Sequence, residues 1–97
     1  MELTRIGVVG AGQMGRGITH VCALAGLDVA LADVSPEALA RAIETIEANL
    51  GRQVARGRIK EDEKAAALKH IKATTDFAAF GDCDMVIEAA KSVVVLM

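Results

Sequence analysis

Three glycines near the amino terminus have the spacing of a phosphate-binding turn. Gly10, Gly12 and Gly15 form a Gly-x-Gly-x-x-Gly pattern directly after the apolar run Ile6–Val9. The first glycine permits a tight turn, the second admits a pyrophosphate close to the backbone, and the third lets the next helix lie close on the strand. The first N–H groups of that helix, at the positive end of its dipole, then face the phosphates.

An aspartate follows at the distance that a ribose-binding acid requires. Asp33 directly follows the second apolar run, Asp28–Ala32. It stands eighteen residues after Gly15, close to the expected spacing of about 20. Its carboxylate would accept hydrogen bonds from a ribose 2′-hydroxyl and repel a 2′-phosphate, and no Arg or Lys stands in Val34–Pro36, so NAD is favoured over NADP. The alternatives are a structural glycine turn and an acid that merely begins the next turn.

The rest of the chain predicts the elements that position these residues. A helix should follow the glycines to about Ala25, and another should begin at the N-cap Ser35 and end near Arg56, before Gly57. The second helix carries an apolar stripe at steps of three and four, formed by Leu39, Ile43, Ile46, Leu50 and Val54. A helix over 61–69 would complete a hairpin, and further strands are expected at 71–75 and 85–89, separated by a turn or a single helical turn over 76–81.

Composition sets further bounds. The 97 residues suffice for one small domain, and the net charge of −2 with scattered basic residues argues against nucleic acid as a partner. No apolar stretch reaches the length of a membrane span, and no basic and apolar leader opens the chain, so a cytoplasmic protein is expected. Cys22 and Cys83 lack the spacing of metal ligands, which predicts free thiols and no metal site.

Four segments together resemble one family. They are the glycine segment Ile6–Ile18, the acid in Leu31–Val34, Thr74–Asp76, and Asp84–Ala90, in addition to the helical hairpin. Over residues 4 to 90 the chain is similar to the NAD-binding N-terminal domain of the 3-hydroxyacyl-CoA dehydrogenases, above all the bacterial 3-hydroxybutyryl-CoA dehydrogenases. The implied fold is α/β, a partial Rossmann-type parallel sheet of strand order 3-2-1-4 with the hairpin inserted after strand 2.

The resemblance also implies an activity and its site. Such enzymes transfer a hydride between NAD and the C3 hydroxyl of an acyl-CoA, in fatty-acid or butyrate metabolism, which makes an acyl-CoA the expected substrate. Two positions on the first hairpin helix match CoA-contacting positions of relatives, Asn49 and Arg56. The cofactor-binding role carries over to Gly10, Ala11, Gly12, Gln13, Met14, Gly15 and Asp33.

The similarity breaks after Ala90. Residues 1–90 are expected to form the NAD-binding domain and 91–97 an apolar tail foreign to the family, as a frameshift or truncation would leave. Ser92 and Met97 stand where relatives have an acid and a lysine. The catalytic His of relatives and the substrate and dimerisation domain would lie beyond this point. His20 and His70 are interpreted as structural, and no catalytic residue is named.

Two other functions stay open at this stage. The β-hydroxyacid dehydrogenases share a Gly-x-Gly-x-Met-Gly opening, although the hairpin and Asp33 speak against them. A nucleotide-binding or oligomer-forming module without turnover is the alternative outside enzymes. The fourth strand is expected to be an open sheet edge, and the uncharged run Val93–Leu96 adds to the risk of self-association, so the isolated chain is expected to be marginally stable or to self-associate.

Overall fold

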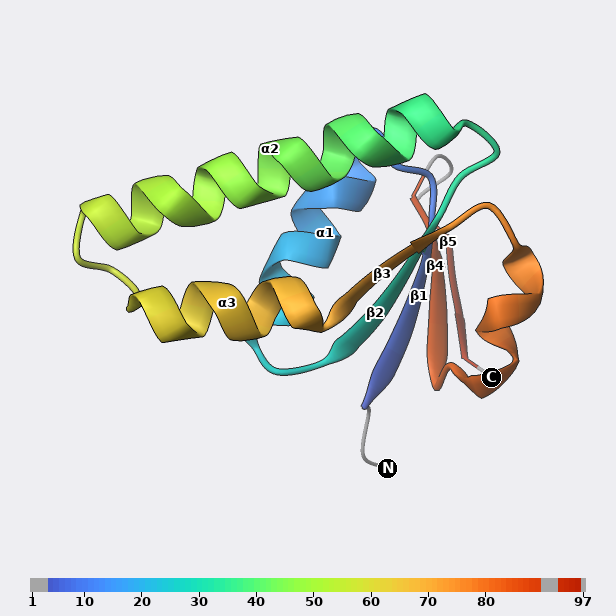
Figure 1. The fold of residues 1–97 in the computed structure, drawn as a ribbon. Coiled ribbons are helices and arrows are strands. Elements are labelled where there is room, and N and C mark those ends of the chain that lie inside the picture. Colours follow the sequence, from blue (N-terminus) through green and yellow to red (C-terminus); the bar gives the residue numbers. More distant parts are fainter. Residues whose placement is uncertain (1–3, 90–92, 97) are drawn as a thin grey trace.

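The computed structural model describes residues 4–89 and 93–96. It shows a twisted sheet with the α-helices on one face (Figure 1). The expectations for Ala90, Lys91, Ser92 and Met97 lie outside these residues. A short 3₁₀ helix, η1 (Phe77–Asp82), lies on the opposite face of the sheet. The elements run in the order β1 (Arg5–Val9), α1 (Gln13–Leu24), β2 (Asp28–Ala32), α2 (Pro36–Ala55), α3 (Glu61–Lys69), β3 (Ile71–Thr74), η1, β4 (Met85–Glu88) and β5 (Val93–Leu96).

The sheet confirms the predicted strand order and adds one strand. Its order is β3-β2-β1-β4-β5, and the first four strands are parallel. The prediction of an open edge at the fourth strand is wrong, because β5 pairs antiparallel with β4 from Met85 opposite Leu96 to Glu88 opposite Val93. The uncharged tail therefore supplies a strand, and the outer edge of the sheet lies at β5.

The predicted helical hairpin is present and begins at its predicted cap. Ser35 Oγ accepts a hydrogen bond from the Ala38 N–H at 3.1 Å, and Gly57 takes a φ of +70° directly after the α2 C-cap. The buried face of α2 consists of Leu39, Ala42, Ile46 and Leu50, whereas Ile43 and Val54 of the predicted stripe are half-buried. A small alanine thus occupies a core position that a search for large apolar residues overlooks. None of the helices in the described part of the chain combines the length and apolarity of a membrane span.

The main core lies between the sheet and the three helices, and a smaller one lies under η1. Leu31, Val8 and Ile46 are among the fully buried side chains of the main core. On the other face, Phe80 and Cys83 pack on Ala32. A Cβ built on Gly7 would stand 2.9 Å from the Phe80 ring, so η1 packs on the sheet at a position where the strand has no side chain.

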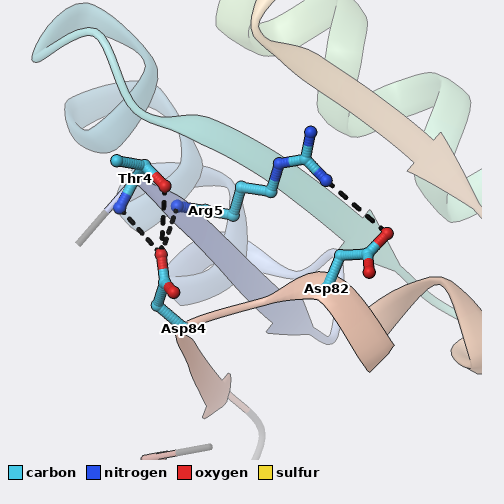
Figure 2. Close-up of polar contacts among 4 residues, drawn as sticks. All are labelled: Thr4, Arg5, Asp82 and Asp84. Atoms are coloured by element: carbon cyan, nitrogen blue, oxygen red, sulfur yellow. Dashed lines mark hydrogen bonds and ion pairs between the residues drawn. The ribbon is translucent and has the colours of Figure 1, made fainter. Parts of the chain in front are cut away.

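One carboxylate joins the amino ends of β1 and β4. Asp84 Oδ2 accepts hydrogen bonds from the Thr4 N–H at 2.9 Å, the Thr4 hydroxyl at 3.1 Å and the Arg5 N–H at 3.1 Å (Figure 2). The Thr4 N–H and then the Arg5 N–H lower the pKa of this carboxyl, because they stabilise its ionised form. Asp84 thereby fixes the two strands side by side at one end of the sheet.

Candidate functional site

The glycine loop turns the chain from the carboxyl end of β1 into α1. Gly10 has a φ of +103°, a left-handed conformation that glycine adopts without strain, and its N–H donates to the Ala32 carbonyl at 2.8 Å. Gly12 is the N-cap of α1, and the Arg16 N–H donates to its carbonyl at 3.0 Å. The amino end of α1 therefore opens at the carboxyl ends of β1 and β2, as a phosphate-binding loop requires.

The second and third glycines have opposite surroundings. A Cβ built on Gly15 would stand 1.7 Å from the Gly10 carbonyl oxygen and 3.5 Å from the Ala89 side chain. A Cβ built on Gly12 would meet nothing within 4 Å. Gly15 is therefore required by the packing of α1 on the sheet, whereas Gly12 is exposed and leaves open space beside the backbone.

Asp33 is tied to the glycine loop by its own carboxylate. Its Oδ2 accepts the Ala11 N–H at 2.9 Å and its Oδ1 accepts the Ser35 N–H at 3.0 Å. These bonds, that of Ala11 first, hold the pKa of the Asp33 carboxyl below its usual range, so the group is ionised at neutral pH. Each carboxylate oxygen can accept more than one hydrogen bond, so acceptor capacity is left for a ribose hydroxyl.

The loop lies at the topological switch point of the sheet. From β1 the chain continues to one side into β2, and β4 lies on the other side. In open α/β sheets, ligands bind outside the carboxyl ends of the strands at this point. The Ala89 N–H donates to the Val9 carbonyl at 2.9 Å, and Glu88 stands beside Val9 in register, half-buried. The ends of β1, β2 and β4 thus surround the amino end of α1.

The candidate site residues on the helices do not all lie at one place. Gln13 and Met14, in the first turn of α1, are exposed. Gln13 and Asn49 line a common hollow of about 370 Å³ between α1 and α2, together with Arg16 and His20. Arg56 does not line it and is exposed at the C-cap of α2.

Asn49 and both histidines have hydrogen-bond partners within the fold. The Asn49 side-chain oxygen accepts from the Arg52 guanidinium. His20 Nε2 lies 2.8 Å from Gln53 Oε1, and His70 Nδ1 lies 2.7 Å from Asp28 Oδ1. His20 joins α1 to α2 and His70 joins β2 to the start of β3, in keeping with the structural interpretation of both rings.

Sequence reasoning missed two features of the site. One is the bond from the Ala11 N–H to Asp33, which no spacing rule reveals because it depends on the φ of Gly10. The other is Arg16, which brings a cation to the α1–α2 hollow one turn beyond Gly12. Both cysteines are free thiols, and no cluster of three or more His, Cys, Asp or Glu suited to a metal ion occurs among residues 4–89 and 93–96.

Comparison with known proteins gives a consistent result. Residues 5–95 match the family model described as 3-hydroxyacyl-CoA dehydrogenase, NAD binding domain. A 3-hydroxybutyryl-CoA dehydrogenase of Bradyrhizobium diazoefficiens is 49% identical over 88 residues, which cover 91% of this chain and 30% of that protein. The chain thus spans less than a third of the length of this relative.

Solved structures agree in fold and in family. The crystal structure of a 3-hydroxybutyryl-CoA dehydrogenase from Escherichia coli K12 matches with a TM-score of 0.88 and 40% identity, covering 91% of this chain and 19% of that one. That of an (S)-3-hydroxybutyryl-CoA dehydrogenase from Ralstonia eutropha matches with a TM-score of 0.88 and 38% identity, covering 91% and 31%.

Proposed function

The chain belongs to the family of 3-hydroxyacyl-CoA dehydrogenase NAD-binding domains, and on that premise we propose that Gly10–Gly15 and Asp33 hold its cofactor. NAD is the cofactor of this domain. The observation that carries the assignment of residues is the bond between Asp33 and the Ala11 N–H, which sets the acid beside the loop. The family match replaces the β-hydroxyacid dehydrogenase reading.

The residues of the loop fit a dinucleotide. The open space at Gly12 admits a pyrophosphate to the backbone, the amino end of α1 attracts its negative charge, and the ionised Asp33 accepts ribose hydroxyls. Gln13 and Met14 contribute the first N–H groups of the helix. Asp33 also orients the Ala11 amide and so keeps the loop in the shape that receives the phosphates.

Titration with NADH, followed by the fluorescence of the cofactor, tests this assignment. We expect saturable binding that Asp33→Ala weakens at least about tenfold, because a charged acceptor is lost. NADPH should bind the wild-type chain more weakly than NADH, and Asp33→Asn should narrow the difference, since the repulsion of the 2′-phosphate disappears. Equal affinity of the wild-type chain for both cofactors would contradict the role of Asp33.

The reaction that we propose for the family protein is hydride exchange with the C3 hydroxyl of an acyl-CoA in fatty-acid or butyrate metabolism. NAD, when bound, supplies the hydride acceptor. The contribution that we assign to the described residues is to bind and orient the cofactor. The alternative is a nucleotide-binding or oligomer-forming module without turnover. Oxidation of NADH by acetoacetyl-CoA above background on addition of the purified chain would exclude the module without turnover, whereas cofactor binding alone is expected to give no oxidation.

We also propose that the CoA part of the substrate lies along α2. Asn49 supports this by its place in the hollow beside Arg16, whereas Arg56 is the weaker candidate because it lies outside that hollow. Asn49→Ala should weaken the binding of CoA several-fold and leave that of NADH unchanged, as measured by calorimetry. Arg41→Ala, an exposed change on the same helix, is the matched control. Equal effects of both variants would contradict the proposal.

Self-association is proposed at β5, the outer strand of the sheet. The run Val93–Leu96 has no charge or proline that would hinder pairing with a second chain. Sedimentation should show dimers or larger species, and Val94→Lys should shift the distribution toward the monomer. A monodisperse monomer with a sharp two-state melt would contradict this.

We place the domain in the cytoplasm, a proposal that the two free thiols support.

A further inference from the structure

A second hollow lies at the end of the sheet opposite the glycine loop. Its volume is about 370 Å³, within the range of small-molecule sites, and it includes residues at the starts of β1 and β2. Asp28 opens β2 and lines this hollow, whereas Asp33 follows the other end of the same strand. At about 3.3 Å per residue, the backbones of the two residues stand roughly 16 Å apart along the strand. The hollow is therefore separate from the cofactor site.

Two small residues in one row of the sheet leave space on this face. Gly7 on β1 stands beside Ala30 on β2, and Ala30 stands beside Lys72 on β3. Phe80 of η1 fills the position above Gly7, and Cys83 forms part of the wall. Ala30 is half-buried and gives the hollow an apolar floor.

Basic side chains outnumber acidic side chains around the hollow. Asp28 pairs with His70, and Asp82 pairs with Arg5 at 3.6 Å (Figure 2). Lys69 and Lys72 also line the hollow, and neither ammonium group has an ion pair or a side-chain hydrogen bond with another described residue. A surplus of positive charge therefore gathers here, in a chain whose net charge is −2.

The Arg5 guanidinium is also available to a ligand. Its ion pair with Asp82 is long, and the two side chains are 52% and 84% exposed, so solvent screens the attraction strongly. A guanidinium binds phosphate oxygens with two parallel hydrogen bonds, which a single distant carboxylate oxygen does not match.

We propose that this hollow binds a small organic phosphate monoester. Lys69, Lys72 and Arg5 surround the dianionic phosphate, and the organic part lies over Ala30 and Cys83. Two ammonium groups and a guanidinium outnumber the carboxylates of Asp28 and Asp82 in the lining, so the hollow attracts a phosphate dianion, and its volume leaves room for more than the phosphate group. The site is independent of the proposed cofactor role of the glycine loop.

Phenyl phosphate is a suitable probe, titrated into the ¹⁵N-labelled chain at low salt with NADH present. Amide signals of Ala30 and Lys72 should shift, and those of Gly10–Gln13 should not. Lys72→Glu should weaken binding about tenfold, whereas Arg58→Glu, the same change of charge on the exposed turn after α2, should not. Inorganic phosphate should bind more weakly than phenyl phosphate.

Three results would overturn the proposal. They are shifts confined to the glycine loop, equal weakening by the two Glu variants, and no shift at all in a chain that circular dichroism shows to be folded. Because the two sites report through different amide signals, failure of NADH binding at Gly10–Gln13 is distinguishable from failure of the phosphate site.

Discussion

Gly12→Ala should greatly weaken the binding of NADH to a chain that still folds. The alanine Cβ meets nothing within 4 Å, and the φ of −75° at this position is accessible to any residue. The same Cβ would occupy the space that a pyrophosphate needs beside the backbone. Loss of one or two charge-assisted hydrogen bonds corresponds to about 3 kcal/mol, roughly a hundredfold in Kd.

Folding and binding are measured separately for this variant. The free energy of unfolding, measured by thermal denaturation followed by circular dichroism, should fall by only about 1 kcal/mol, the typical cost of an alanine at an N-cap. NADH fluorescence titration should show the loss of affinity. Wild-type affinity in Gly12→Ala would mean that the dinucleotide does not approach the backbone at this loop, and the proposed site would then be wrong.

Gly15→Ala should instead reduce the stability of the folded chain. Its Cβ would stand 1.7 Å from the Gly10 carbonyl oxygen and 2.9 Å from the Gly10 carbonyl carbon, both backbone atoms that cannot swing aside. Either α1 or the end of β1 must move. We expect a loss of about 3 kcal/mol in the free energy of unfolding, measured by urea denaturation.

A second glycine of the same helix is the matched control. Gly17 is exposed in α1, and a Cβ there meets nothing within 4 Å. Gly17→Ala should stabilise the chain by about 0.5 to 1 kcal/mol, because alanine loses less backbone entropy in a helix. Two identical substitutions two residues apart thus have effects of opposite sign. Equal stability of the two variants would contradict the close packing of α1 on Gly10.

The conformation of the glycine loop could be predicted because its backbone geometry restricts the residue type directly. Gly10 needs a left-handed φ and Gly15 needs to lack a Cβ, and each requirement admits essentially one residue type. The strand order 3-2-1-4 came from the resemblance to the family, and it agrees with the rule that right-handed crossovers leave few topologies for alternating strands and helices. The glycine positions can be recognised in a sequence because the backbone at each of them admits almost no other residue type.

The features that sequence reasoning missed depend on distances between elements. Val93–Leu96 is too short and uniform for its periodicity to reveal a partner, so its pairing with β4 was not foreseen. Arg56 lies seven residues after Asn49, on nearly the same face of α2, but the helix ends at Ala55. The α1–α2 hollow is lined by Asn49 and not by Arg56, which no helical wheel indicates.

The bond network of Asp84 bears on the order in which the domain assembles. Thr4 and Asp84 are 80 residues apart in sequence, so the pairing of β1 with β4 closes nearly the whole chain. The loop from β1 through Asp33, by contrast, is complete within thirty residues. Closing the longer loop costs more chain entropy, and such non-local pairings slow folding. The glycine loop can therefore form early, while the ends of the strands beside it come together only when β4 pairs with β1.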